Sequence, residues 1–238
     1  MGALHNRFSK APNQQDLVWL IPGIFVIYFG SLLVAIGLSA KAYDWRRNSI
    51  SWLLYPRNDP AFHLIASVAV AVTGVLIVPI TAYIRTRLRS GTTALTDLGA
   101  IILGLGAFLL SLSGLIVSHP YAGKARLPGL HEGLARSAAL ALGIGMLVLW
   151  LSAVKTWARS AERDSRLGRL LVAWSILIVP AILVVALRIA AYAARAWPTV
   201  VFRTIASRSL WHLGFWEWIG SAAVFLFLLS SALLLPDE

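Results

Sequence analysis

The stretch YPRNDPAFHLIASVAVAVTGVLIVPITAYI, residues 55–84, sets a polar, proline-containing opening directly against a long apolar run. A helix needs about 20 largely apolar residues to cross the hydrocarbon core of a bilayer. The run at 61–84 therefore predicts a membrane-spanning helix. Asp59 and Pro60 are expected to begin it, because Asp is a favoured N-cap residue and Pro is favoured at the first helical position.

The rest of the chain repeats this pattern. Apolar runs of comparable length occupy residues 17–40, 61–84, 98–118, 132–154, 170–190 and 211–235. Each run is continuous rather than alternating, which favours helices over the strands of a membrane barrel. We therefore predict an all-α fold, in which residues 1–238 form a single integral membrane domain built as a six-transmembrane-helix bundle.

Composition supports a membrane protein. Of the 238 residues, 58% are hydrophobic and 13% are charged, whereas a soluble domain carries roughly a quarter charged residues. The absence of cysteine excludes disulfides, thiolate metal sites and cysteine nucleophiles. The net charge of +11 is carried by short segments between apolar runs, so membrane lipids with anionic headgroups are the expected partners and nucleic acid is not.

The distribution of cations predicts an orientation. The first apolar run is too long for a signal peptide, so we expect it to be retained as a span. An even number of spans places both termini on one side. The compact basic segments RTRLR (85–89) and KTWARSAERDSRLGR (155–169) lie on that side, next to span ends. The positive-inside rule then predicts cytoplasmic termini. The Ala, Leu and Arg bias suggests a bacterial cytoplasmic membrane.

Glycines in the third and fourth runs are expected to let helices approach one another closely, because small residues mark helix interfaces in membranes. These glycines are Gly99, Gly104, Gly106, Gly114, Gly143 and Gly145.

A basic segment separates the fifth and sixth runs. Arg188, Tyr192 and Arg195 recur there at helical spacing, with apolar residues between them. This pattern predicts an amphipathic stretch that lies in the membrane interface. Trp211 and Trp218 of the last run are seven residues apart and are expected to meet the lipid headgroups.

Four histidines fall at span ends, all on the side opposite the termini: His63, His119, His131 and His212. Neutral imidazole suits zinc and iron, so these histidines are candidate ligands of a divalent metal, with zinc as the possible cofactor. The charged residues near these histidines also have purely structural interpretations. Asp59 is a plausible helix cap, and Glu132 pairs with Arg136 at i, i+4 near a helix start.

Glu217 is the strongest candidate for chemistry. It lies in WHLGFWEWIG, residues 211–220, about two turns into the last span, where its helical neighbours are mostly small. An ionisable residue inside a span is costly and is a functional candidate by default. Its expected partner is Arg188, a histidine, or a proton of its own, and a purely structural ion pair or hydrogen bond is an equal alternative. Candidate catalytic residues are Glu217, His63 and Asp59.

The order of features resembles the six-span membrane proteins of the autophagy-modulator (DRAM-like) type and their prokaryotic relatives of unknown function. The resemblance rests on NSISWLLYPRNDPAFHLIASVAV (48–70) and FWEWIG (215–220). The matching residues are Ser49, Ile50, Ser51, Glu217 and Trp218. It implies a bundle with its N-terminus inside, associated with lipid organisation, and it carries over no catalytic residues.

Three functions follow as hypotheses. The first is a non-enzymatic multi-pass protein whose outer polar cluster binds lipid headgroups or a membrane partner. The second is a metal-dependent membrane hydrolase similar to alkaline ceramidases and adiponectin receptors. Those proteins usually have seven spans and an H-x-x-x-H pair, which this chain lacks, and zinc would need the helix starts at His63, His131 and His212 to converge. The third is an accessory subunit of a larger membrane complex.

Overall fold

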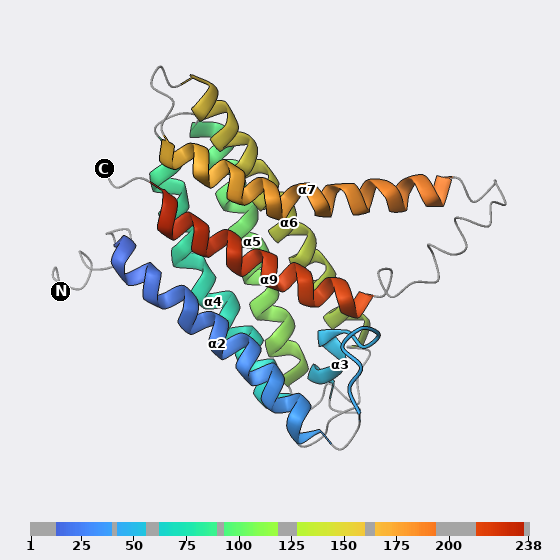
Figure 1. Ribbon diagram of the computed structural model, residues 1–238. Coiled ribbons are helices and arrows are strands. Elements are labelled where there is room, and N and C mark those ends of the chain that lie inside the picture. The colour runs from blue at the N-terminus through green and yellow to red at the C-terminus, as the bar shows by residue number, and fades with distance from the viewer. Residues whose placement is uncertain are drawn as a thin grey trace, which may run out of the picture.

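The computed structural model describes residues 13–39, 42–55, 62–89, 93–118, 128–159, 165–193 and 213–235. Every regular element in these ranges is a helix (Figure 1). The helices are α2 (Gln14–Leu38), α3 (Ile50–Leu54), α4 (His63–Leu88), α5 (Thr93–Ser118), α6 (Pro128–Arg159), α7 (Ser165–Ala193) and α9 (Leu213–Leu234). The predicted all-α fold is confirmed.

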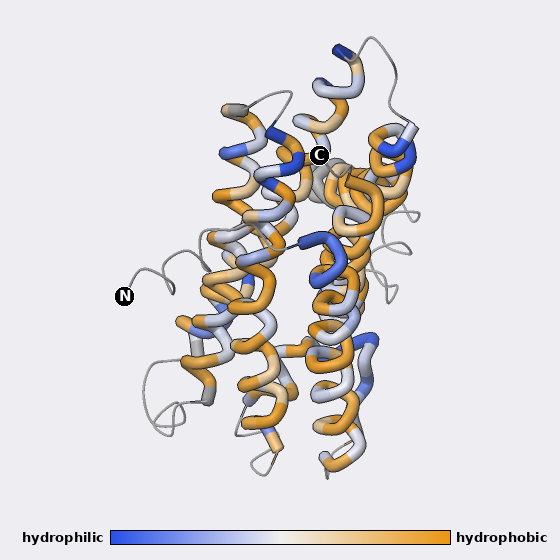
Figure 2. Tube along the Cα trace, turned by 90° about the vertical axis from the view of Figure 1, so that its left-hand side faces the viewer, coloured by the Kyte–Doolittle hydropathy of each residue, from blue (hydrophilic) through white to orange (hydrophobic). Residues whose placement is uncertain are grey.

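Six of the described helices are long and apolar enough to cross a membrane, and α3 is too short to do so. Hydrophobic residues dominate the long helices, while hydrophilic residues gather toward their ends (Figure 2). The protein therefore has the architecture of a multi-pass membrane protein. Each predicted span overlaps one of the six long helices.

The start of α4 differs from the sequence prediction. The helix begins at His63, with Phe62 at the N-cap position, and so starts after the predicted Asp59–Pro60 opening. Asp59 and Pro60 themselves lie outside the described residues. His63 is consequently the first residue of the helix rather than a residue one turn inside it.

Helices α4, α5 and α6 form the most closely packed part of the bundle. A Cβ atom at Gly74 would lie 2.5 Å from the Ala107 carbonyl oxygen, and one at Gly114 would lie 2.6 Å from the Ser67 carbonyl oxygen. Both distances are too short for a real side chain, so glycine is what allows the backbones of α4 and α5 to meet.

The α5–α6 contact confirms most of the glycine prediction. A Cβ atom at Gly99, Gly106 or Gly145 would lie 2.9 Å or less from the facing helix. Gly104 makes an ordinary contact of 3.6 Å with Thr81. The prediction is wrong for Gly143, which has no neighbouring atom within 4 Å of the position a Cβ would take.

Helices α2, α7 and α9 are less buried than α4 and α5. Helix α9 runs antiparallel to α2, because Gln14 Nε2 donates to the Ala232 carbonyl oxygen (2.7 Å) and the Tyr28 and Ser221 hydroxyls are 3.1 Å apart. Trp174 of α7 stacks on Phe227 of α9 with ring centroids 4.2 Å apart.

The C-terminal half of α7 leaves the other helices (Figure 1). Ile182, Leu183 and Val185 are exposed in this half. Arg188 and Tyr192 lie in its last turns, so the helix continues into the segment that the sequence assigned to the membrane interface.

Contacts between helices define a polar end of the bundle, which we call the loop end. It contains residues 42–55, the first turns of α4, α6 and α9, and the last turns of α2 and α5. Two contacts fix this arrangement: His131 of α6 reaches Ser113 of α5, and Glu217 of α9 reaches Ile50 of α3. The opposite end carries the ion pair between Arg85 Nε and Asp97 Oδ1, at 2.7 Å.

Candidate functional site at the loop end

Glu217 caps the short helix α3. Its Oε2 atom accepts a hydrogen bond from the Ile50 N–H at 2.5 Å, and the Ser51 backbone N–H also donates to this carboxylate. The side chain of Ser49, at the N-cap position, makes no capping bond of its own. The first N–H groups of a helix have no intrahelical partner. Glu217 supplies that partner from a helix distant in the sequence.

Tyr43 fixes the turn that precedes α3. Its hydroxyl donates toward the carbonyl oxygens of Asn48 (3.0 Å) and Ser49 (3.2 Å) and accepts a hydrogen bond from Trp218 Nε1 (3.0 Å). Burial raises the pKa of Tyr43 to about 12, although the Trp218 bond acts in the opposite direction. The hydroxyl therefore stays neutral, and able to donate, throughout the physiological pH range.

Gly214 lets α9 cross the same turn. A Cβ atom at this position would lie against the Asn48 carbonyl oxygen and 2.7 Å from the Asn48 carbonyl carbon. Any larger residue would push the turn away from α9. The first turns of α9 thus hold residues 42–55 through three neighbouring positions: Gly214, Glu217 and Trp218.

Aromatic rings surround these polar contacts. Trp218 stacks on Phe29 of α2, with ring centroids 5.8 Å apart and an interplanar angle of 30°. Tyr43 packs against Trp52 at 5.6 Å. Such pairs contribute roughly 0.5–1.5 kcal/mol beyond the burial of their surface. The loop is therefore held by packing as well as by hydrogen bonds.

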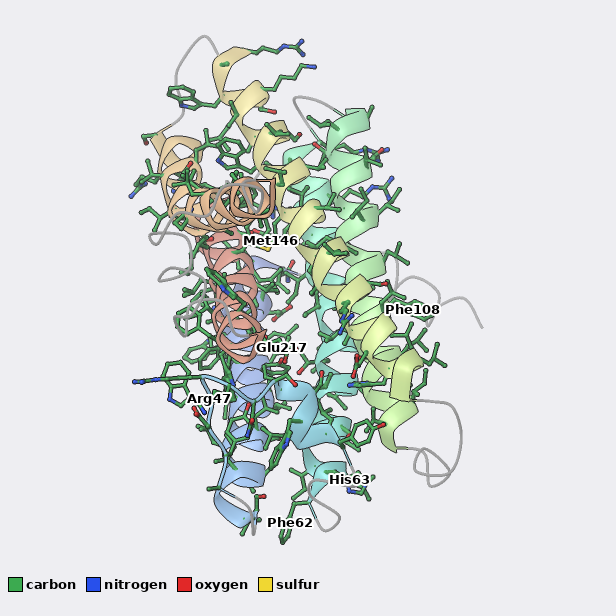
Figure 3. All side chains as sticks on the ribbon, turned by 90° about the vertical axis from the view of Figure 1, so that its right-hand side faces the viewer. Arg47, Phe62, His63, Phe108, Met146 and Glu217 are labelled. Atoms are coloured by element: carbon green, nitrogen blue, oxygen red, sulfur yellow. The ribbon has the colours of Figure 1, made fainter. Side chains whose placement is uncertain are left out.

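Exposed cations lie on the outer side of this anchored loop. The Arg46 guanidinium lies over the Trp45 ring, 5.4 Å from its centroid, and Trp45 is 45% exposed. The Arg47 side chain is 76% exposed and is 3.7 Å from Asp44. Exposed pairs of this kind are weak, so Arg47 remains able to bind another anion. Figure 3 shows Glu217 inside the molecule near α3 and Arg47 at its edge.

The two described histidines lie at the loop end, as predicted. His131 is buried, with 2% of its surface exposed, and its Nδ1 lies 3.0 Å from the Ser113 carbonyl oxygen. Because the carbonyl can only accept, Nδ1 carries the proton, and Nε2 has no hydrogen-bond partner within the described part of the chain. The Ser67 hydroxyl donates to the His63 carbonyl oxygen at 2.8 Å, a bond within α4.

The structure does not bring together a metal site from described residues. No group of three His, Cys, Asp or Glu residues suited to a metal occurs in the ranges that the structure describes. His119, His212 and Asp59 lie outside those ranges, so the zinc hypothesis stays a prediction.

Other predicted residues have different surroundings. The structure places the indole ring of Trp218 among Phe29 and Tyr43, whereas the sequence assigned it to the lipid headgroups. Arg195 and Trp211 lie outside the described residues. The predicted i, i+4 pair is confirmed, with Arg136 Nη2 3.1 Å from Glu132 Oε2 on the exposed surface.

Sequence reasoning found Glu217 but missed its partner. Among the described groups, those that bind its carboxylate are backbone N–H groups of α3. The side chain of Arg188, like His119 and His212, lies outside the described part of the chain. The contact joins two segments far apart in the sequence, Ile50 and Ser51 with Glu217. Sequence reasoning also missed Tyr43 and Gly214.

No protein-family model, curated protein or solved structure matches the chain.

Proposed function

We propose that this multi-pass membrane protein is non-enzymatic and binds anionic lipid headgroups at the loop end. The observation that supports the proposal is that the exposed guanidinium groups of Arg46 and Arg47 are carried by a loop whose backbone α9 already holds in place. A preformed site loses less conformational entropy on binding than a flexible one. Trp45, exposed beside them, has the amphipathic ring that favours the membrane–water interface.

Glu217 supports the non-enzymatic assignment. Glu217 is the strongest candidate for chemistry in the sequence, yet its carboxylate caps α3 and connects α3 to α9. In this arrangement the carboxylate serves the fold, because backbone donors of α3 engage it. A resemblance to the DRAM-like membrane proteins agrees with a role in lipid organisation and is part of this proposal.

Native mass spectrometry tests the proposal by counting bound phosphatidylglycerol and phosphatidylcholine on the detergent-solubilised protein. Cations near a bilayer surface contribute about 1 kcal/mol each, so replacing both Arg46 and Arg47 by alanine is expected to weaken phosphatidylglycerol binding roughly 30-fold. Phosphatidylcholine binding is expected to be unchanged.

Arg159 is the matched control, because it is an exposed arginine at the opposite end of the bundle. Arg159→Ala is expected to retain the binding that the double variant loses. Equal binding of the two lipids by the unmodified protein, or equal loss in both variants, would contradict the proposal.

A metal-dependent membrane hydrolase is the second candidate function. The observation that favours it is the buried Nε2 atom of His131, which has no hydrogen-bond partner among the described residues and lies at the same end of the bundle as His63. Metal analysis of the purified protein separates the two candidates. Stoichiometric zinc that is lost in His131→Ala would favour the hydrolase, whereas a metal-free protein would favour lipid binding. Copurification of a stable partner would instead support an accessory subunit.

Orientation and location are further parts of the proposal. Cytoplasmic termini would place the loop end on the outer face of a bacterial cytoplasmic membrane. The dense basic segments at 85–89 and 155–169 support this orientation.

A further inference from the structure

We propose that Glu217 is a proton-operated latch, whose carboxylate holds α3 on α9 and whose protonation releases α3. The proposal stands on the geometry of the cap. One carboxylate, carried by an otherwise uncharged helix, receives the Ile50 and Ser51 N–H groups from a helix of five residues. It does not depend on the lipid binding proposed above.

Because α3 is short, its stability depends strongly on the cap that Glu217 provides. Helices shorter than about 12 residues are marginal in water without outside support. Helix α3 buries Ile50, Leu53 and Leu54, and its start is held from outside by Glu217. Hydrogen bonds to an ionised acceptor are roughly twice as strong as those to a neutral one. A neutral Glu217 would therefore hold the start of α3 much less firmly.

Glu217 has no ion-pair partner among the described residues. Within the described residues, α9 has no other charged side chain, α3 has none, and no cation forms an ion pair with Glu217. The titratable or charged groups that act on it from neighbouring elements are Tyr28 of α2, Tyr43 of the loop, and Glu132 and Arg136 of α6.

Arg136 forms no ion pair with Glu217 among the described contacts: its Nη2 is 3.1 Å from Glu132 Oε2, and the charge of Glu132 opposes that of Arg136 at Glu217. The bonds of Tyr43 to Trp218, Asn48 and Ser49 join neutral groups and survive acidification. Protonation therefore frees α3 while the turn before it stays anchored to α9. The latch acts at one hinge, between Ser49 and Ile50.

Amide hydrogen exchange of the full-length protein in phosphatidylcholine nanodiscs tests the latch without any anionic lipid. The readout is the protection of the Ile50 and Ser51 amides from about pH 8 to about pH 3, a range that extends below the ordinary titration of a carboxyl group, corrected for the pH dependence of intrinsic exchange. Protection in the unmodified protein is expected to fall about tenfold over this range, the difference between a charge-assisted and a neutral hydrogen bond.

Glu217→Gln is the key variant, since glutamine keeps an acceptor oxygen but carries no charge. It is expected to show the low-pH level of protection at every pH. Asp97→Asn, which removes a carboxylate at the opposite end, is expected to keep the profile of the unmodified protein. Amides of α5 in the same data report whether each variant is folded.

Protection at Ile50 and Ser51 that is independent of pH in the unmodified protein would overturn the latch, whatever the variants do. So would full protection in a folded Glu217→Gln protein. Neither result bears on phosphatidylglycerol binding, so the latch and the lipid-binding proposal fail separately.

Discussion

At the scale of single residues, the isolated carboxylate of the last span has a defined set of contacts. Glu217 stands out in the sequence because a carboxylate is costly inside a span, and the structure gives it a specific task. Its partner could not be predicted, because the N–H groups of Ile50 and Ser51 have no sequence signature. Tyr43 was missed because its role depends on a turn that brings Asn48 and Ser49 under its hydroxyl.

The pKa of Tyr43 predicts a pH dependence of stability. Its value of about 12 lies above the ordinary tyrosine value of 10.0, so the folded protein holds the phenolic proton more tightly than the unfolded chain. The resulting stabilisation is complete below pH 10 and is lost as the pH rises toward 12. Thermal unfolding at about pH 9 and about pH 11 should show a smaller decrease for Tyr43→Phe than for the unmodified protein. Parallel decreases would contradict the assignment.

Gly214 provides a second prediction at this scale. Gly214→Ala places a Cβ atom against the Asn48 carbonyl and is expected to cost roughly 1–3 kcal/mol, typical of overpacking. Gly220→Ala is the control on the same helix, because nothing lies within 4 Å of its Cβ position, and it should be neutral or slightly stabilising. Unfolding in detergent measures both. Similar midpoints for the two variants would show that α9 does not press on the turn.

At the scale of elements, all six spans could be predicted, because a run of about 20 apolar residues rarely forms anything but a spanning helix. Helix α3 could not, since ISWLL is too short to show a period. The start of α4 lies later than cap chemistry predicts. Glycine contacts were predicted for α5 and α6, yet Gly143 faces open space. The prediction failed there because the sequence does not say which side of a helix meets its neighbour.

The close approach of α4 and α5 gives the prediction at this scale. Gly114→Ala would bring a Cβ atom to 2.6 Å from the Ser67 carbonyl oxygen and 2.7 Å from the Ala71 nitrogen. We expect a loss of roughly 1–3 kcal/mol of stability. Gly143→Ala is the control and should be close to neutral. The comparison uses thermal unfolding in one detergent, and a stable Gly114→Ala protein would refute the contact.

At the scale of the whole molecule, the bundle separates its charges between two ends. The loop end presents Arg46 and Arg47, while Asp97 partly neutralises Arg85 and Arg89 at the opposite end. The sequence predicted that His63 and His131 share one end, and the structure confirms it. Which end faces the cytoplasm depends on the cell's insertion machinery and is predicted from the density of cations alone.

The absence of cysteine makes this orientation directly measurable. A single cysteine in place of Arg47 is expected to react with a membrane-impermeant maleimide in intact cells. A single cysteine in place of Arg166, at the start of α7, is expected to react only after the cells are opened. The reverse pattern would invert the orientation without altering the fold.

The most direct test of the central claim is a cryo-electron microscopy structure of the protein in nanodiscs that contain phosphatidylglycerol. We predict that residues 42–55 are docked on α9 through Glu217, with a lipid phosphate within hydrogen-bond reach of Arg46 or Arg47. A loop detached from α9, or anionic lipid ordered only at the opposite end of the bundle, would contradict this claim.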